Sequence, residues 1–210
     1  MSKTARGAKA ATNSQRFFLL DLLGADNKDL CFLDTFVKGI EDERWRPAGG
    51  ERLSPVYPKK PLIALSKKYK GIELTDFLAN SFNCIVGSTA FKEAVEAHCP
   101  KDTVEFLPFT LIDHRGRPHS DDYFLINPLG TFDCLDFKAS DIGWSDDTPD
   151  EILDVEEHVL DRAKMKEAPQ FFRIDRDITS YVLGVELIRE MKKRALTNVI
   201  VEELEFSDSR

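Results

Sequence analysis

Two segments of this chain, offset by 97 residues, carry the same pattern of glycine, helix and strand. Laid over each other without a gap, residues 84–109 and 181–206 are identical at six positions. The six pairs are Gly87/Gly184, Glu93/Glu190, Val104/Val201, Glu105/Glu202, Leu107/Leu204 and Phe109/Phe206. The pattern indicates a possible internal strand–helix–strand duplication. It predicts a few helices packed on one face of a mostly antiparallel sheet, which is an α+β fold.

The remainder of the chain reads mostly as short strands. Apolar or alternating runs predict strands at residues 16–23, 30–36, 62–65, 103–113, 122–127, 132–137, 154–160, 170–175 and 199–206. Pro108 lies inside one of these runs and indicates an edge position or a bulge, because proline has no N–H to donate.

Helices are expected at two places, and both belong to the repeated pattern. Ser88 or Thr89 can cap a first helix that ends near His98. A strongly amphipathic second helix is expected at residues 185–195. Prolines and glycines at residues 41–61 predict a long loop with short extended pieces, and residues 73–80 read as a short helix or an irregular segment.

The N-terminal residues differ in composition from the rest. Residues 1–15 are small, polar and basic, and they predict a disordered basic tail before a single domain at residues 16–210. They lack the apolar core of a secretory signal, and no apolar run approaches the length of a membrane span. The four cysteines form no C-x-x-C pair and read as reduced thiols. We therefore expect a cytoplasmic protein that does not contact a membrane.

Charge is distributed unevenly along the chain. The formal net charge is −8, yet residues 71–210 hold 29 acidic and 15 basic side chains. Such an acidic surface repels nucleic acid phosphates, so direct nucleic acid binding is not expected. It would attract a basic protein and accelerate encounter with it.

The densest acidic run lies between Asp133 and Asp161, which holds 11 acids and one base, Lys138. One reading is a solvated loop and strand edge that keeps the protein in solution. The other is a docking surface for a basic partner, with Trp144 as an anchor within a charged rim. The candidate partner-binding residues are Trp144, Asp146, Asp147, Asp150, Glu151, Asp154, Glu156 and Glu157.

Catalytic and metal-binding motifs give little support for an enzyme. The nearest to a catalytic motif is Asp136-Phe137-Lys138, a D-x-K that, with upstream carboxylates such as Asp113, would suit a metal-dependent nuclease. A zinc site from Cys84, His98, Cys99, His114 and His119 matches no familiar ligand spacing. We therefore expect no catalytic residues, no metal and no cofactor.

Several segments, taken in order, resemble one known family. They are Trp45–Pro47, Leu74–Phe77, Ile85–Ser88 with the following helix, Val104–Pro108, Tyr123–Asn127, Phe132–Asp136, Phe171–Ile174 and Val201–Leu204. Together they resemble the bacterial polymorphic-toxin immunity family typified by a myxobacterial immunity protein. The resemblance covers roughly Phe17–Phe206, and its most specific part is Tyr-x-Leu-x-Asn followed by Asp-Cys-Leu-Asp.

The resemblance implies an α+β protein without catalytic residues, encoded beside a toxin that is often delivered between bacterial cells. The leading hypothesis is an immunity protein that binds and neutralises a cognate, basic toxin in the cytoplasm. An adaptor or chaperone that binds an effector without neutralising it is the alternative, and a nuclease using Asp136 and Lys138 is a third. The sequence leaves the oligomeric state and the identity of the toxin open.

Overall fold

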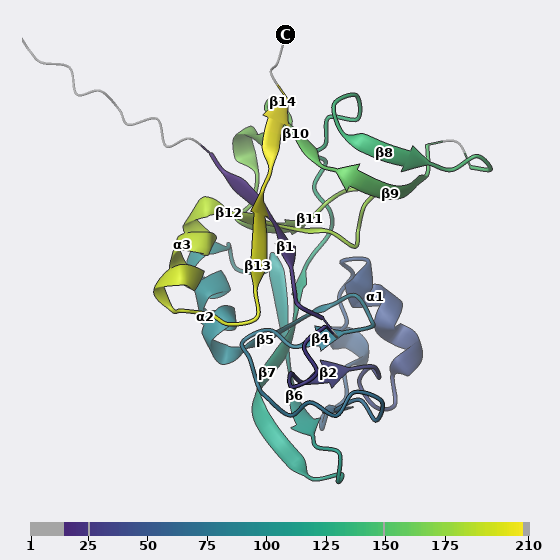
Figure 1. Ribbon diagram of the computed structural model, residues 1–210, viewed down its shortest axis with the longest axis vertical. Helices are drawn as coiled ribbons and strands as arrows, with labels where there is room; N and C mark the ends of the chain where they lie inside the picture. Colours follow the sequence, from purple (N-terminus) through teal and green to yellow (C-terminus); the bar gives the residue numbers. More distant parts are fainter. Residues whose placement is uncertain (1–14, 25, 149, 208–210) are drawn as a thin grey trace, which may run out of the picture.

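The computed structural model describes residues 15–24, 26–148 and 150–207. Strands outnumber helices in this part of the chain, and most neighbouring strands run antiparallel (Figure 1). The α+β class predicted from the sequence is therefore confirmed. Except for Gln15, the predicted basic tail at residues 1–15 lies outside the described residues.

The first four-stranded sheet is built around a long hairpin. β6 (Val104–Ile112) and β7 (Pro118–Pro128) form the hairpin, and β5 (Ile85–Ser88) pairs antiparallel with β7. β3 (Leu62–Ala64) pairs parallel with the end of β6, which gives the order β3–β6–β7–β5. α2 (Thr89–His98) connects β5 to β6, so β7 lies between the two strands that the helix joins.

The second four-stranded sheet has the same arrangement around the first strand of the chain. α3 (Val185–Lys193) joins β12 (Tyr181–Gly184) to β13 (Ile200–Glu203). β1 (Phe17–Asp21) lies between these two strands and is antiparallel to both. β11 (Phe171–Arg173) completes the order β11–β12–β1–β13. β1 therefore occupies the position in this sheet that β7 occupies in the first.

The strand–helix–strand layout predicted for both repeated segments is confirmed, and the correspondence extends further upstream than the sequence indicated. β3 begins at Leu62 and β10 (Val159–Asp161) begins 97 residues later. β10 pairs parallel with β14 (Glu205–Ser207), which follows β13, just as β3 pairs parallel with the end of β6. We call β3–β5–α2–β6–β7 the first unit and β10–β12–α3–β13–β14, with β1, the second unit.

The two helices lie side by side and cover one face of both sheets (Figure 1). Their buried side chains enter a single apolar cluster with strand residues of both units. From the helices these are Phe91, Ala94, Val95, Leu187, Ile188 and Met191. Because burial of apolar surface is the main driving force of folding, this shared cluster holds the two units together. The predicted packing of the helices on one face is confirmed.

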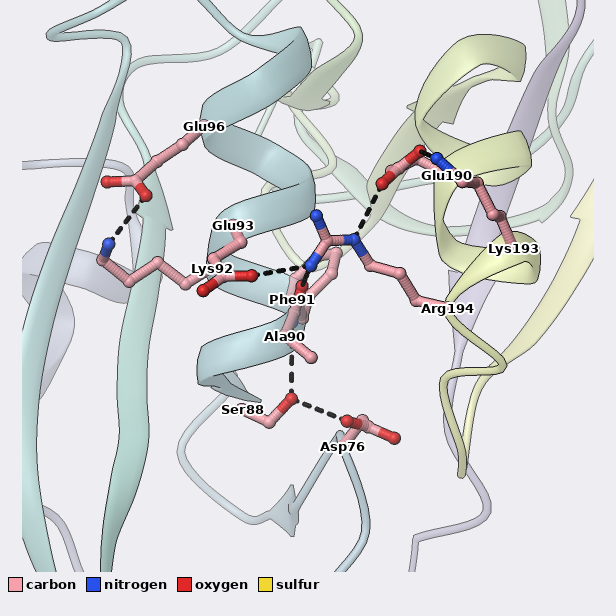
Figure 2. A network of polar contacts seen from close by, with 10 residues as sticks. All are labelled: Asp76, Ser88, Ala90, Phe91, Lys92, Glu93, Glu96, Glu190, Lys193 and Arg194. Carbon is pink, nitrogen blue, oxygen red and sulfur yellow. Dashed lines mark hydrogen bonds and ion pairs between the residues drawn. The ribbon is translucent and has the colours of Figure 1, made fainter.

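Arg194, directly after α3, joins the two helices at their surface (Figure 2). Its guanidinium donates to Glu93 of α2 at 2.7 Å and to Glu190 of α3 at 2.8 Å. Hydrogen bonds to these two carboxylates raise the pKa of Arg194. Glu93 and Glu190 are an identical pair of the repeat, so equivalent residues of the two units bind the same arginine.

The start of α2 shows why the helix begins where it does. The hydroxyl of Ser88 accepts a hydrogen bond from the Phe91 N–H at 3.3 Å, the bond expected of an N-cap. It also donates to Asp76 at 2.7 Å (Figure 2). Of the two predicted caps, Ser88 is therefore the one used.

Long connections cover the opposite face of each sheet. The chain between β1 and β5 covers the first sheet, and it buries Leu33, Val37, Leu53 and Leu78 against Leu107, Leu111 and Leu125. The chain between β7 and β11 covers the second sheet, and it buries Cys134, Leu135, Leu160 and Met165 against Phe17, Phe172 and Val182. The short elements within these connections are β2 (Phe32–Leu33), β4 (Ala79–Asn80), η1 (Glu41–Arg44), α1 (Trp45–Ala48), η2 (Ser54–Val56) and η3 (Lys164–Glu167).

Several local predictions need correction. Residues 132–137 are not a strand, because they make only isolated bridges, from Phe132 to Ile174 and from Leu135 to Leu160. Their apolar side chains, including the neighbours Cys134 and Leu135, pack beneath the second sheet without belonging to a ladder. Residues 30–36 contribute only the two residues of β2, and the loop at residues 41–61 contains helical turns in place of extended pieces.

Two open predictions receive an answer. Residues 73–80 are irregular except for β4. Pro108 lies where β6 pairs with β7 on one side, before its pairing with β3 begins at Thr110, so it occupies an edge position.

None of the helices in the part of the chain that the structure describes is long and apolar enough to cross a membrane.

Candidate functional site

A separate hairpin extends from the body of the protein beside the second sheet (Figure 1). β8 (Asp141–Trp144) and β9 (Ile152–Glu157) pair antiparallel and form a two-stranded sheet of their own. The register shifts twice, so Leu153 and Glu156 have no partner in β8 and form bulges. We call residues 141–157 the acidic arm.

The two faces of the acidic arm differ in chemistry. Cross-strand partners share a face, which places Ile142 and Val155 together with Trp144 and Ile152. Val155 packs against the core beneath the second sheet, and the Trp144 ring lies 6.0 Å from the Phe137 ring, centre to centre. This apolar face therefore connects the arm to the body.

The opposite face carries the partners Asp141 and Glu157, followed by Gly143 and Asp154. The carboxylate of Asp154 lies where a Cβ on residue 143 would be, so the glycine makes room for it. This face is open to solvent, and its charged side chains are all carboxylates.

All carboxylates of the acidic arm are exposed. The arm holds eight acids and no lysine or arginine; they are Asp141, Asp146, Asp147, Asp150, Glu151, Asp154, Glu156 and Glu157. Among the described residues, none of the eight is within ion-pair distance of a basic side chain. The ion pairs of the protein involve other acids, such as Asp113 with Arg117 and Glu203 with Arg16. The arm therefore presents negative charge that the described part of the protein does not compensate.

The structure brings the predicted partner-binding residues together in one element. Asp146, Asp147 and Asp150 lie in the loop at the tip, while Asp154, Glu156 and Glu157 lie on β9. Glu151 leads into β9, where its carbonyl accepts the Ser145 N–H at 2.9 Å. Trp144, proposed as an anchor, is 41% exposed.

Two residues of this surface were not among the predicted ones. Asp141 pairs with Glu157 at the base of the hairpin and adds to its acidic face. Leu153 is 66% exposed, the highest exposure of any large apolar side chain in the described residues. Its sequence context reads as an ordinary strand, and only the bulge explains why it turns to solvent.

The base of the acidic arm is fixed by a buried polar contact. His158, between β9 and β10, bonds through Nε2 to Oδ2 of Asp177 at 2.8 Å, and the two side chains are only 8% and 13% exposed. Burial raises the pKa of Asp177, but hydrogen bonds from His158, Ser180 and Thr179 outweigh that effect and lower it. This contact thus connects the base of the arm to the segment between β11 and β12.

The carboxylates of Asp136 and Asp113, named for the nuclease alternative, both bond within their own turns. Asp136 lies in a turn, where its carboxylate accepts the backbone N–H groups of Lys138 at 3.0 Å and Ala139 at 3.3 Å. Asp113 lies in the β6–β7 turn and binds Arg117 at 2.8 Å. Within residues 15–24, 26–148 and 150–207, no three His, Cys, Asp or Glu side chains group closely enough to hold a metal ion.

The thiols are not arranged as nucleophiles. Cys31, Cys84 and Cys134 are buried, and Cys99 is partly exposed; all four are free. Burial raises the pKa of Cys99 to about 11 and that of Cys84 to about 12, so both remain protonated at neutral pH.

Comparison with known families agrees with the resemblance found in the sequence. A model of an immunity protein family, Imm11, matches residues 31–205. That range includes the acidic arm and both units, except for β1 and the last two residues of β14. A search of curated proteins found no match. With most of its length covered by this one family model, the chain belongs to the Imm11 immunity protein family.

Proposed function

We propose that this protein neutralises a cognate toxin in the cytoplasm by binding to it, and that the acidic arm is the principal docking element. Membership of an immunity family supports the toxin as partner. The observation that carries the choice of surface is the set of eight exposed carboxylates without a basic neighbour in the described residues.

The charge of the acidic arm indicates the chemistry of the partner. Unpaired surface carboxylates attract a basic protein, and complementary charge raises association rates well above the neutral range of about 10⁵–10⁶ M⁻¹s⁻¹. A basic toxin surface would supply the counter-charges that the arm lacks. A nuclease toxin, whose substrate is anionic, has such a surface.

Two apolar side chains supply the anchors that affinity needs. Affinity usually depends on a few large side chains that lose water in the complex and are surrounded by a polar rim. Trp144 and Leu153 are 41% and 66% exposed; Trp144 ends β8 next to the acidic loop at the tip, and Leu153 precedes Asp154 on β9. We propose that they bury against the toxin while the carboxylates form the rim.

Residues 16–210 are proposed to act as one domain. β1 directs Phe18 into the cluster shared by both units and Phe17 into the cluster beneath the second sheet. The guanidinium of Arg173, on β11, donates to the carbonyl of Pro47 in the loop that covers the first sheet. Limited proteolysis should therefore leave this region as a single fragment.

Co-expression tests the proposed function. Each toxin-like neighbouring gene is expressed with this protein, with the variant D146N/D147N/D150N/E151Q, or with the control D26N/D42N/E73Q/D102N. The control neutralises four exposed acids outside the arm and changes the net charge equally. We expect the wild type and the control to restore growth, and the arm variant to restore it weakly or not at all.

The same experiment separates the alternatives. Binding without restored growth would identify an adaptor or chaperone instead of an immunity protein. Restored growth by the arm variant at wild-type level would exclude the acidic arm as the docking element. If no neighbouring gene product is neutralised by the wild type, the proposed function is wrong.

A further inference from the structure

The second unit ends in a strand whose outer edge is open. β13 is the last strand in the order β11–β12–β1–β13, and it pairs only with β1. The Leu204 N–H donates to the Phe17 carbonyl at 2.9 Å. Because hydrogen-bonded pairs alternate along an antiparallel ladder, Ile200 and Glu202 direct their backbone groups toward β1. Val201 and Glu203 direct theirs outward, and no hydrogen bond from the described residues reaches them.

An apolar groove runs beside this open edge. A cavity of about 200 Å³ lies between α3 and β13. It is lined by Ile188, Met191, Lys192, Leu196, Val199 and Val201. Its only charged lining residue in the described part of the chain is Lys192, which is exposed. The groove and the edge together provide unpaired backbone groups and a site for an apolar side chain, the two requirements of strand addition.

The first unit has an equivalent groove with different chemistry. The cavity between α2 and β6 is lined by Val95, Cys99, Asp102 and Val104, which lie 97 residues before Lys192, Leu196, Val199 and Val201. Glu96 and Lys101 also line it, so its surface is much more charged. Further along this edge, Pro108 has no N–H, and its carbonyl accepts from the Tyr57 hydroxyl at 3.0 Å. Of the two grooves, the one beside β13 is the better suited to an apolar side chain.

Charge and chain continuity indicate what occupies the groove. Glu202 and Glu205 are exposed beside this edge without an ion pair in the described residues, which favours a basic segment, whereas Glu203 is already paired with Arg16. β13 leads through Leu204 into β14, which pairs with β10, and only His158 separates β10 from β9 of the acidic arm. The open edge is therefore connected to the arm through β14 and β10.

We propose that β13 accepts an extended, basic segment of the cognate toxin as an added strand, with one apolar side chain of that segment in the groove between α3 and β13. This inference rests on the proposed function, since it takes the toxin as the partner. The backbone groups of Val201 and Glu203 bond the added strand, while the acidic arm holds a second part of the same toxin.

A proline at position 203 tests the added strand. The Glu203→Pro variant removes an outward N–H without removing a bond to β1, whereas Glu203→Ala removes the same carboxylate and keeps the N–H. Both lose the ion pair with Arg16. We expect Glu203→Pro to weaken binding of the neighbouring toxin about tenfold and Glu203→Ala about twofold or less. A thermal melt of each variant verifies that it is folded.

Amide exchange on the unmodified protein gives an independent test. In the free protein the Val201 and Glu203 amides should exchange rapidly and the Glu202 amide slowly, because only the last donates to β1. In the toxin complex the exchange of Val201 and Glu203 should slow at least tenfold. A complex that forms while these two amides exchange unchanged would overturn the added strand and leave the proposed function standing. If no toxin binds at all, both fall.

Discussion

Glu105 is a buried carboxylate whose replacement should weaken the fold by a predictable amount. It lies on β6 with 6% of its surface exposed. It accepts the Leu53 N–H at 2.9 Å, the Ser54 N–H at 3.0 Å and the Asn127 side-chain amide at 3.3 Å. The bonds from Leu53 and Ser54 fasten the loop at residues 41–61 to the first sheet, and the bond from Asn127 joins β7 to β6.

The magnitude follows from how many donors lose their acceptor. In Glu105→Gln one carboxylate oxygen becomes an NH₂ group, so at least one backbone N–H is left without a partner. An unpaired buried donor costs about 1–3 kcal/mol, and we expect a loss of about 2 kcal/mol in the free energy of unfolding. Glu105→Ala removes all three bonds and should cost about 4 kcal/mol, since bonds to charged groups contribute about 1.5–3 kcal/mol each and are not additive.

The same contacts predict a dependence on pH. Burial raises the pKa of Glu105, but the hydrogen bonds from Leu53, Ser54 and Asn127 outweigh it and lower the pKa below its ordinary value of 4.5. A carboxylate with a depressed pKa stabilises the fold fully above its unfolded-state pKa, and the contribution is lost as the pH falls through the folded-state pKa. The difference between the wild type and Glu105→Gln should therefore shrink below about pH 4.5.

Urea denaturation at pH 7 and at acidic pH measures both effects. The repeat provides a matched control, because Glu202 is the equivalent residue of the second unit, and its exposed carboxylate accepts no hydrogen bond from the described residues. Glu202→Gln should change stability by less than about 0.5 kcal/mol. Equal effects of the two substitutions, or a Glu105→Gln effect that does not depend on pH, would refute the reasoning.

Three further predictions concern the two units and the base of the acidic arm. Gly87→Ala places a Cβ 2.7 Å from Cδ1 of Phe91 in the core and should cost about 1–3 kcal/mol by thermal unfolding, whereas Gly184→Ala meets only the flexible side chain of Gln170 and should cost less. Ser88→Ala removes the N-cap of α2 and should cost about 1 kcal/mol in urea denaturation; an unchanged midpoint would contradict the cap. His158→Ala breaks the contact with Asp177 and should speed cleavage within the arm by a protease specific for acidic residues, which divides the single wild-type fragment into two pieces that meet at the arm.

The sequence was informative where the structure depends on local chemistry. The repeated glycine, helix and strand predicted both units because a cap such as Ser88 and an amphipathic pattern such as that of α3 act over a few residues. The acidic run was equally visible. Its division into an apolar and an acidic face was not, because that division depends on which residues of β8 and β9 pair and on two bulges.

The predictions failed where apolar residues are buried outside a ladder. Apolar residues and aspartates are mixed over residues 132–137 in a way that suggests a strand, yet Phe132 and Leu135 each make only one isolated bridge and pack beneath the second sheet. Alternation reports which side chains are buried and not which backbone groups are paired. The insertion of β1 between β12 and β13 was equally hidden, since its partners lie more than 160 residues away along the chain.

The two units differ in the chain segment that leads into their parallel edge strand, β3 in the first unit and β10 in the second. We propose that this difference determines where a partner binds. The chain that enters β3 folds back on its own unit, where Leu53 and Ser54 bond Glu105 and Tyr57 bonds the carbonyl of Pro108. The chain that enters β10 instead forms the acidic arm and leaves the body.

As a result, the second unit leaves exposed a carboxylate and backbone groups whose counterparts in the first unit are bonded within the protein. Glu202, the counterpart of Glu105, is exposed, and the outward backbone groups of Val201 and Glu203 have no partner in the described residues. This open edge of the second unit is the surface on which we propose that the partner adds a strand. A proline at residue 203 removes one outward N–H of that edge. It should therefore weaken toxin binding while the fold of both units is kept.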